Sequence, residues 1–329
     1  MTDAIRWHSA TVRAHRDMTP TVREFEIRPE GGVKPWSVGS HIELQVVVDG
    51  AMQTRSYSLV GTPQADGANE VYRIAVRRAE PGRGGSRWMW SLETGTELLI
   101  SEPENRFALS YGAPHTLLVA GGIGITPILG MALTLARRGS LMRMCYAARS
   151  ATDFAYGAEL RAALGDRLAT FDGANGQRLD LGREFAALPP KAQAWVCGPL
   201  RLLDAAREAW AAAGRSAAGL HIETFGNSGH FDAEAFWCEV PRHGIRVVVP
   251  PERSLLDVLA EAGVEALSDC RRGECGLCAM DIVRTEGTID HRDVFLGGSE
   301  KRTNQRLCAC VSRVRGGGVV LDSAYRPDT

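Results

Sequence analysis

Three cysteines in the last third of the chain have a spacing that suits iron chemistry. Four residues separate Cys270 from Cys275, and two separate Cys275 from Cys278. This is the spacing of thiolates that bind a [2Fe–2S] cluster. Gly273 and Gly276 allow positive φ, so backbone N–H groups can approach the inorganic sulfides closely. Cys-x2-Cys also binds zinc, but a zinc site needs no four-residue spacer with glycines, so we predict a [2Fe–2S] site.

A glycine loop near the middle of the chain suits a bound phosphate. Residues 119–127 read Val-Ala-Gly-Gly-Ile-Gly-Ile-Thr-Pro, between a predicted strand and a predicted helix. Backbone N–H groups and the helix dipole favour an anion there, although a tight turn without a ligand is the alternative. A second turn, Val196-Cys197-Gly198-Pro199, ends a later strand. Ligands of open α/β sheets bind at that edge, so we predict a nucleotide site.

A short run in the first third of the chain combines a cation, an aromatic ring and hydroxyls. It reads Arg55-Ser56-Tyr57-Ser58-Leu59. An arginine can pair with phosphate through two hydrogen bonds, and a tyrosine offers a flat face. Such a strand alone is more often an exposed sheet face, but residues 82–86, Gly-Arg-Gly-Gly-Ser, can form a nest of N–H groups around a second anion. Together the two runs predict a flavin mononucleotide.

The elements that position these residues fall into three segments. Short alternating runs at 21–27, 41–48, 53–59, 71–77 and 97–100 predict an antiparallel barrel, with Asp49-Gly50 as a hairpin turn. A buried strand at 115–120 then leads to a helix at 127–138, which we expect Thr126 to cap and Gly139 to end. Strands at 143–147, 193–197 and 221–225 alternate with helices at 156–164 and 200–213, which predicts a parallel sheet covered on both faces.

The C-terminal segment holds the cysteines. Residues 227–235 are predicted to be a linker, followed by strands at 236–240 and 245–249 and a helix at 254–262. The expected domains are therefore a barrel at 1–106, a nucleotide domain at 107–226, the linker at 227–235 and a cysteine domain at 236–329.

Composition excludes several classes of function. The formal net charge is −1 and no basic run exceeds two residues, so we expect no nucleic-acid partner. No stretch reaches the roughly 18–20 apolar residues of a membrane span, and the N-terminus lacks a signal peptide's apolar region. Eight cysteines in 329 residues are too few for a disulfide scaffold. We expect a cytoplasmic, monomeric protein.

The motifs in their order along the chain resemble those of one family. They are RSYSL at 55–59, GRGGS at 82–86, AGGIGITP at 120–127, VCGP at 196–199, CRRGECGLC at 270–278 and CVSR at 310–313. This set resembles the phthalate dioxygenase reductase family, which includes vanillate O-demethylase reductases, over about residues 5–322. The resemblance implies an antiparallel β-barrel of the ferredoxin-reductase type that binds FMN, an α/β parallel-sheet domain for NAD(P)H, and an α+β ferredoxin domain of the β-grasp type.

The resemblance also implies roles for individual residues. Ser58 would lie near the flavin N5, Cys197 near the nicotinamide, and Phe225 over the flavin ring, although Phe225 could equally be a core aromatic. The expected flavin-binding residues are Arg55, Ser56, Tyr57, Ser58, Val76, Gly84, Gly85 and Ser86. The expected nucleotide-binding residues are Gly121, Gly122, Gly124, Thr126, Gly198 and Pro199.

The fourth cluster ligand is either Cys310 or Cys308. The two residues are two apart on an expected strand, so their side chains would point to the same face. Spacing favours Cys308, which follows Cys278 after 29 residues. The Val-Ser pair after Cys310 resembles the residues that follow the last ligand in the family, and we therefore expect Cys310 to be the ligand.

The implied function is electron transfer. Hydride from NADH carries two electrons and the cluster accepts one at a time, so a flavin must stand between them. The resemblance favours NADH, although Arg149 could accept the 2′-phosphate of NADPH. It implies a terminal Rieske non-haem iron oxygenase as acceptor, with a haem-thiolate monooxygenase as the alternative. We expect the acceptor to dock over the cluster loop, near Arg271, Arg272 and Glu274. The sequence does not indicate the organic substrate, because that substrate binds to the oxygenase and not to this chain.

Overall fold

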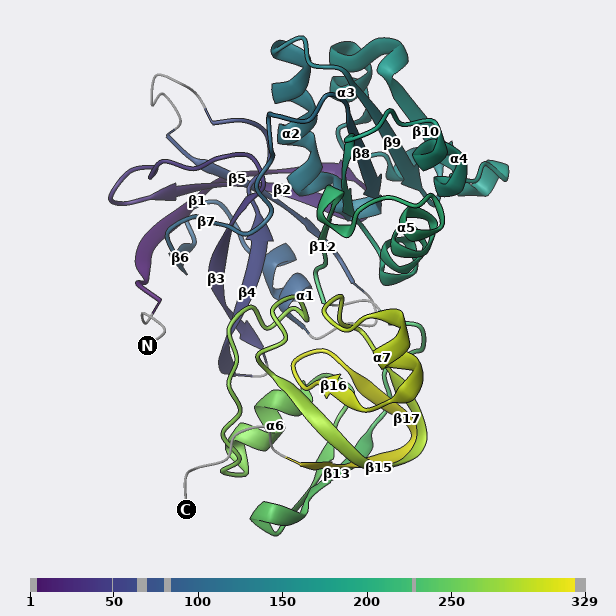
Figure 1. Cartoon of the computed structure of the whole chain (residues 1–329). Helices are drawn as coiled ribbons and strands as arrows, with labels where there is room; N and C mark the ends of the chain where they lie inside the picture. The colour runs from purple at the N-terminus through teal and green to yellow at the C-terminus, as the bar shows by residue number, and fades with distance from the viewer. Residues whose placement is uncertain (1–4, 49, 64–69, 80–83, 227–228, 323–329) are drawn as a thin grey trace. The chain divides into compact units, whose positions relative to one another are not determined.

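The computed structural model describes residues 5–48, 50–63, 70–79, 84–226 and 229–322 (Figure 1). The chain divides into two compact units. The first contains the residues up to 198 together with 205–223, and the second contains 199–204 and the residues from 224 onward.

The N-terminal part of the first unit is an antiparallel sheet of seven strands in the order β4-β3-β6-β1-β2-β5, with β7 on β3. An isolated bridge between Leu59 and Ile74 joins the two ends of this order, so the predicted barrel is confirmed. Alternate residues such as Phe25 and Ile42 fill its core. The elements are β1 (His8–Thr19), β2 (Val22–Pro29), β3 (Ser40–Val48), β4 (Ala51–Ser58), β5 (Tyr72–Arg77), α1 (Gly85–Trp90), β6 (Glu97–Ile100) and β7 (Glu104–Asn105).

The sequence did not predict β1, although it is twelve residues long. Two register shifts, at Val12/Ala14 and Asp17/Thr19, interrupt its pairing with β2. Each shift moves the following side chains to the opposite face, so the alternation of apolar and polar residues is lost. The predicted hairpin is present as the pair Val48 and Ala51, and Asp49 of its turn lies outside the described residues.

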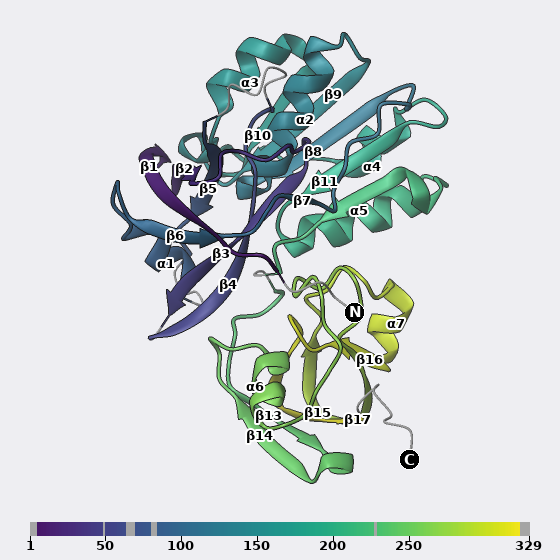
Figure 2. The ribbon, with the colours of Figure 1, turned by 90° about the vertical axis from the view of Figure 1, so that its left-hand side faces the viewer.

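The remainder of the first unit is a five-stranded parallel sheet in the order β10-β9-β8-β11-β12. Figure 2 shows α2 and α3 on one face and α4 and α5 on the other, as predicted. All six residues of β8 are buried, which is typical of a parallel strand covered on both sides. The elements are β8 (Thr116–Gly121), α2 (Ile125–Arg137), β9 (Met142–Ala148), α3 (Gly157–Leu164), β10 (Leu168–Asp172), α4 (Leu181–Ala186), β11 (Gln193–Cys197), α5 (Leu200–Ala212) and β12 (Leu220–Glu223).

The prediction that Thr126 caps the helix after the glycine loop is wrong. The loop forms a 3₁₀ turn, η1 (Gly122–Gly124), that continues directly into α2 at Ile125. Thr126 lies in the first turn of α2, and its hydroxyl donates to the carbonyl of Ile123 at 3.0 Å. The helix is extended backwards by the turn and therefore needs no separate capping side chain. The last predicted strand also ends two residues early, at Glu223.

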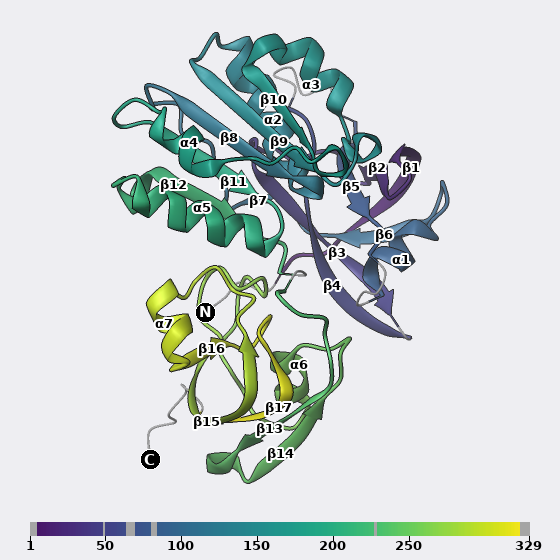
Figure 3. The ribbon, with the colours of Figure 1, turned by 90° about the vertical axis from the view of Figure 1, so that its right-hand side faces the viewer.

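The second unit is a mixed sheet in the order β14-β13-β17-β15-β16. Only β13 and β17 run parallel among these pairs, and Figure 3 shows α7 beside β16. The Ser254 hydroxyl accepts from the N–H of Asp257 at 3.1 Å and caps α6. The arrangement is the predicted ferredoxin fold. Its elements are β13 (Phe236–Val240), β14 (Ile245–Val249), α6 (Leu255–Glu261), β15 (Ala279–Asp290), α7 (Gly298–Thr303), β16 (Arg306–Cys308) and β17 (Arg313–Asp322).

The described part of the predicted linker packs on the second unit. The N–H of His230 donates to Asp290 at 3.0 Å, and Arg292 donates to the carbonyl of Phe231 at 2.8 Å. These bonds hold the backbone of the segment in place. In the described ranges no helix is long and apolar enough to cross a membrane.

Candidate electron-transfer sites

The loop that carries the first three cysteines wraps its backbone around Cys270. The sulfur of Cys270 accepts from the N–H groups of Arg272 at 3.5 Å, Glu274 at 3.3 Å and Cys275 at 3.3 Å. Gly273 has φ +79°, and a Cβ there would lie 2.8 Å from Cα of Asp293. Only glycine lets the loop pack this tightly. The N–H groups seen here approach the sulfur of Cys270, and their approach to inorganic sulfide stays a prediction.

The thiols of the second unit gather in two groups. Cys270 is hydrogen-bonded to Cys275, and Cys278 is hydrogen-bonded by Cys308 and Cys310, which lowers the pKa of Cys278. A [2Fe–2S] cluster has two irons held by four thiolates. The two groups therefore offer the donor set that such a cluster needs, from the chain's own residues.

Cys308 and Cys310 do not share a strand, so the reason given for placing them on one face is wrong. Strand β16 ends at Cys308, and the chain turns there because the N–H groups of Val311 and Ser312 both bond to the carbonyl of Cys308. The turn still brings both thiols to Cys278. Cys310 also accepts from the N–H of Gly273 and interacts electrostatically with Cys270, whereas Cys308 interacts with Asp293.

The side chains on the cluster loop differ in exposure. Arg271 is exposed and forms an ion pair with Asp257. Arg272, in contrast, is only 7% exposed and pairs with Glu274 at 3.3 Å. The expectation that Arg272 faces a docking partner is therefore wrong. The exposed side chains of this loop are Arg271 and Leu277.

Phe295 is a residue of this site that the sequence analysis missed. Its ring lies against Gly276, where a Cβ would approach the ring to 2.3 Å, and it is 42% exposed. Nothing in the spacing of the cysteines signals it, because it lies 17 positions beyond Cys278 in the sequence.

The two glycine turns of the nucleotide domain meet at one edge of the parallel sheet. Ala120 at the end of β8 is in register with Cys197 at the end of β11. A Cβ on Gly124 would lie 2.2 Å from the carbonyl oxygen of Cys197 and 2.8 Å from the nitrogen of Gly198. The chain order reverses between β8 and β11, and open α/β sheets bind ligands at such a switch point. Pro199, which follows Gly198 in the chain, is exposed, and Gly121, Gly122 and Thr126 line the turn on the β8 side.

The residues expected around the flavin phosphate also come together. Arg55 packs on Gly85, where a Cβ would lie 2.9 Å from the guanidinium Nε. Gly84 precedes α1 with φ +78°, and the Ser86 hydroxyl accepts from the N–H of Ala79 at 3.1 Å. Gly82 and Arg83 lie outside the described residues. The described side of the expected phosphate site therefore contains a cation, a helix start and two glycines.

Strand β4 presents the other expected flavin residues. Ser58 is buried, and its hydroxyl lies 3.5 Å from a carboxylate oxygen of Glu223. Tyr57 packs on the barrel core, and burial raises the pKa of its hydroxyl. The Ser56 hydroxyl lies 3.5 Å from a carboxylate oxygen of Glu43. Sequence reasoning missed Glu223, which is 165 positions from Ser58.

Val76 and Phe225 are the two remaining residues that we expected to contact the flavin. The Val76 side chain belongs to the barrel core, and its carbonyl accepts from the Trp90 indole at 3.0 Å. Phe225 lies two residues beyond β12, belongs to the second unit and is half-buried. Their contact with a flavin stays a prediction.

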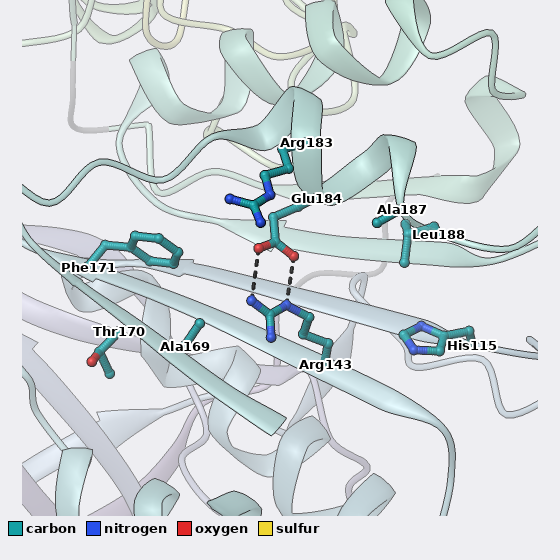
Figure 4. A pocket seen from close by; sticks show the side chains of 9 residues that line it. All are labelled: His115, Arg143, Ala169, Thr170, Phe171, Arg183, Glu184, Ala187 and Leu188. Carbon is teal, nitrogen blue, oxygen red and sulfur yellow. Dashed lines mark hydrogen bonds and ion pairs between the residues drawn. The ribbon is translucent and has the colours of Figure 1, made fainter. Parts of the chain in front are cut away.

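A pocket of about 540 Å³ lies elsewhere in the first unit, between α4 and the sheet (Figure 4). Arg143 and Glu184 bridge it through two bonds of 2.7 and 3.0 Å. His115 and Arg143 stand at the amino ends of β8 and β9, whereas the glycine turns stand at the carboxyl ends. This pocket contains none of the predicted site residues.

Comparison with known proteins agrees with this geometry. Residues 239–315 match the family model "2Fe-2S iron-sulfur cluster binding domain". The heme-dependent oxidative N-demethylase beta subunit of Ectopseudomonas mendocina (strain ymp) is 38% identical, over 94% of this chain and 97% of that protein. The carnitine monooxygenase reductase subunit of Escherichia coli (strain K12) is 34% identical, over 93% and 95%. A solved phthalate dioxygenase reductase superposes with a TM-score of 0.72 at 29% identity, over 96% of this chain and 98% of that one.

The chain belongs to the phthalate dioxygenase reductase-like family of oxygenase reductases. As such it is an NADH-dependent iron–sulfur flavoprotein reductase. When bound, a flavin would supply two-electron hydride uptake and a [2Fe–2S] cluster would supply one-electron transfer. The residues of this oxygenase reductase fit these cofactors. The backbone of the cluster loop and the paired thiols fit the cluster, the glycine turns fit the pyridine nucleotide, and the contact of Arg55 with Gly85 fits the flavin phosphate.

Proposed function

We propose that this oxygenase reductase binds FMN and delivers electrons to a terminal Rieske non-haem iron oxygenase. The observation that supports FMN is the packing of Arg55 on Gly85 at the start of α1. A guanidinium beside backbone N–H groups suits a terminal phosphate dianion. FMN ends in such a phosphate, whereas FAD continues into a second nucleotide.

The assignments of individual residues form part of this proposal. Ser58 lies beside the reactive ring of the flavin, with Cys197 at the nicotinamide and Phe225 over the flavin. The glycine turns at Gly124 and Gly198 bind the pyridine nucleotide. Gly124 approaches the Cys197 carbonyl so closely that the two turns form one surface. The cluster ligands are Cys270, Cys275, Cys278 and Cys310.

The domain boundaries are proposed at the positions expected from the sequence, with residues 227–235 joining the nucleotide and ferredoxin domains. Within the cell the protein is proposed to be a cytoplasmic monomer. None of the eight cysteines, all within the described ranges, forms a disulfide, which is typical of a reducing compartment.

A second class of acceptor is supported by one comparison. The relative from Ectopseudomonas mendocina is named as the beta subunit of a heme-dependent demethylase. A haem-dependent oxygenase is therefore the alternative acceptor. Mixing the NADH-reduced protein with purified oxygenases of each type distinguishes the two, because only the true partner is reduced rapidly at low concentration.

The visible spectrum and released cofactor test the core of the proposal. The purified protein is expected to show flavin absorption with broad iron–sulfur absorption, both bleached by NADH. Acid-released flavin is expected to co-elute with FMN. Release of FAD would contradict the FMN assignment alone, whereas a colourless zinc-containing protein would contradict the whole proposal.

A further inference from the structure

A line of hydrogen bonds connects the glycine loop to a tyrosine in the neighbouring strand. Tyr146 lies on β9 and its side chain is fully buried. Its hydroxyl lies 3.3 Å from the carbonyl oxygen of Gly122 and 3.3 Å from that of Ala155. A tyrosine hydroxyl has one proton, and because it lies equally far from both carbonyl oxygens it can form a three-centre hydrogen bond to the two of them. The ring thus links the loop to the segment that precedes α3.

The next residue of that segment reaches the barrel. Tyr156 has φ +60°, a backbone conformation that residues other than glycine rarely adopt. Its side chain is 4% exposed, and its hydroxyl donates to the Glu24 carboxylate at 2.7 Å. Burial raises the pKa of Tyr156, which keeps the donor proton in place. The unusual backbone conformation therefore serves a buried contact between the two parts of the first unit.

Glu24 is itself firmly held in the barrel. It lies on β2 and is 4% exposed. Arg73 of β5 donates to it at 2.6 Å and Arg16 of β1 at 3.1 Å. Two cations from neighbouring strands fix this carboxylate, because a buried charge is stable only when paired and hydrogen-bonded. The tyrosine hydroxyl is thereby attached to the rigid sheet that carries β4 and Arg55.

We propose that Tyr146 and Tyr156 are positioning residues for hydride transfer, which hold the glycine loop in a fixed place relative to the flavin barrel. Neither residue contacts a reacting atom. Their effect is on the position of the bound nucleotide. Tyr146 connects the loop at Gly122 to Ala155. The adjacent residue, Tyr156, is bonded to Glu24 of the barrel. The inference rests on the proposed nucleotide site at the glycine loop.

The test uses the flavin-loaded, full-length protein with Tyr146→Phe, Tyr156→Phe and the double variant. The rate of flavin bleaching is measured after rapid mixing with excess NADH. Each single variant is expected to slow bleaching by between about 10-fold and 100-fold, because a misplacement of about 1 Å costs up to that much. The double variant is expected to be no slower than the slower single variant, since either change interrupts the same connection.

Binding of NAD⁺ to the oxidised protein gives a readout that does not depend on turnover. Tyr146→Phe releases Gly122 and is expected to weaken NAD⁺ binding. Tyr156→Phe leaves the loop itself intact and is expected to leave NAD⁺ affinity unchanged while slowing bleaching. A role in stability alone would not produce this division between binding and rate.

Tyr72→Phe is the matched control. Tyr72 is a buried tyrosine of the barrel whose hydroxyl accepts from the N–H of Lys34 at 2.7 Å, outside the connection to the loop. This variant is expected to lower thermal stability without slowing bleaching. If Tyr156→Phe lowers stability by a similar amount and bleaches at the wild-type rate, or if the two single effects multiply in the double variant, the positioning role is wrong.

Glu24→Gln provides a second route if Tyr156→Phe does not retain flavin. It keeps the size of the acceptor but removes the charge that receives the hydroxyl, and slower bleaching is again expected, whereas an unchanged rate contradicts the inference. Failure of the proposed function is distinguishable, because in that case the wild-type protein itself would not bind NAD⁺ or be bleached by NADH.

Discussion

Cys270 shows how a single residue depends on its loop. Burial raises the pKa of its thiol, and the N–H groups of Arg272, Cys275 and Glu274 act in the opposite direction. Metal binding requires the thiolate. The backbone donors therefore favour the charged form that iron needs, and they do so only while the loop keeps its glycine-dependent shape.

The fourth ligand is the first prediction at this scale. Cys310→Ser is expected to lose most of the cluster, because Cys310 is the thiol that the loop reaches through Gly273. Cys308→Ser is the matched control and is expected to retain it. Iron content and visible absorption after purification measure the difference. Full absorption in Cys310→Ser would transfer the role to Cys308.

Local spacing indicated three of the proposed cluster cysteines, because they lie within nine residues of one another. The choice between Cys308 and Cys310 stays a prediction, because the turn after β16 brings both thiols to Cys278. The position of Glu223 beside Ser58 could not be predicted from the sequence either. It meets Ser58 only because the barrel and the parallel sheet pack together, and no local pattern encodes that.

At the scale of elements, glycines decide which turns are possible. Gly276 and Gly316 both have positive φ, +74° and +72°. A side chain at Gly276 would meet the Phe295 ring at 2.3 Å, whereas Gly316 has nothing within 4 Å. A side chain at Gly316 would therefore cause backbone strain alone, whereas a side chain at Gly276 would cause the same strain together with a steric clash.

We predict that Gly276→Ala destabilises the cluster loop more than Gly316→Ala destabilises its turn. The control is expected to cost roughly 1–2 kcal/mol from left-handed strain alone. Gly276→Ala adds a clash that forces the ring or the loop to move, so faster loss of cluster absorption on warming is expected. Equal rates of loss in the two variants would show that the ring moves away easily.

Elements with strong local patterns were the ones that sequence analysis found. Strand β8 is buried on both faces, and α2 ends at Arg137, two residues before Gly139, which has φ +65°. In contrast, α4 has only six residues and β10 alternates weakly, with one buried residue among five. Such short elements are stabilised by their neighbours in the fold more than by their own sequence.

At the scale of the whole molecule, the three-part fold was predictable because each part carries its own motif. The flavin, nucleotide and cluster motifs occur in separate segments, so each could be assigned without knowing how the parts pack. The grouping of residues 199–204 with the second unit was not predictable, because residues 200–204 begin α5, whose remaining residues belong to the first unit.

Transfer to the partner is the prediction that belongs to this scale. Arg271→Glu reverses an exposed charge beside Cys270, the first proposed cluster ligand, and it is expected to slow electron transfer to the oxygenase but not to ferricyanide. The effect should shrink at high salt, because exposed charges are screened. Arg284→Glu is the control, since the side chain of Arg284 is 60% exposed, against 52% for Arg271, but lies on β15 with Glu286. Equal slowing by both variants, or slowing with ferricyanide as well, would contradict docking at the loop.

The contact of Gly124 with the Cys197 carbonyl limits which residues can be changed to alter the preference of the protein between NADH and NADPH. The smallest side chain at Gly124 would force the ends of β8 and β11 apart, so this part of the proposed nucleotide site tolerates no variation. Arg149, by contrast, is exposed just past the end of β9, at the place where open α/β sheets recognise the adenosine ribose. A library directed at Arg149 and Ser150 can explore NADH against NADPH preference while the scaffold stays intact.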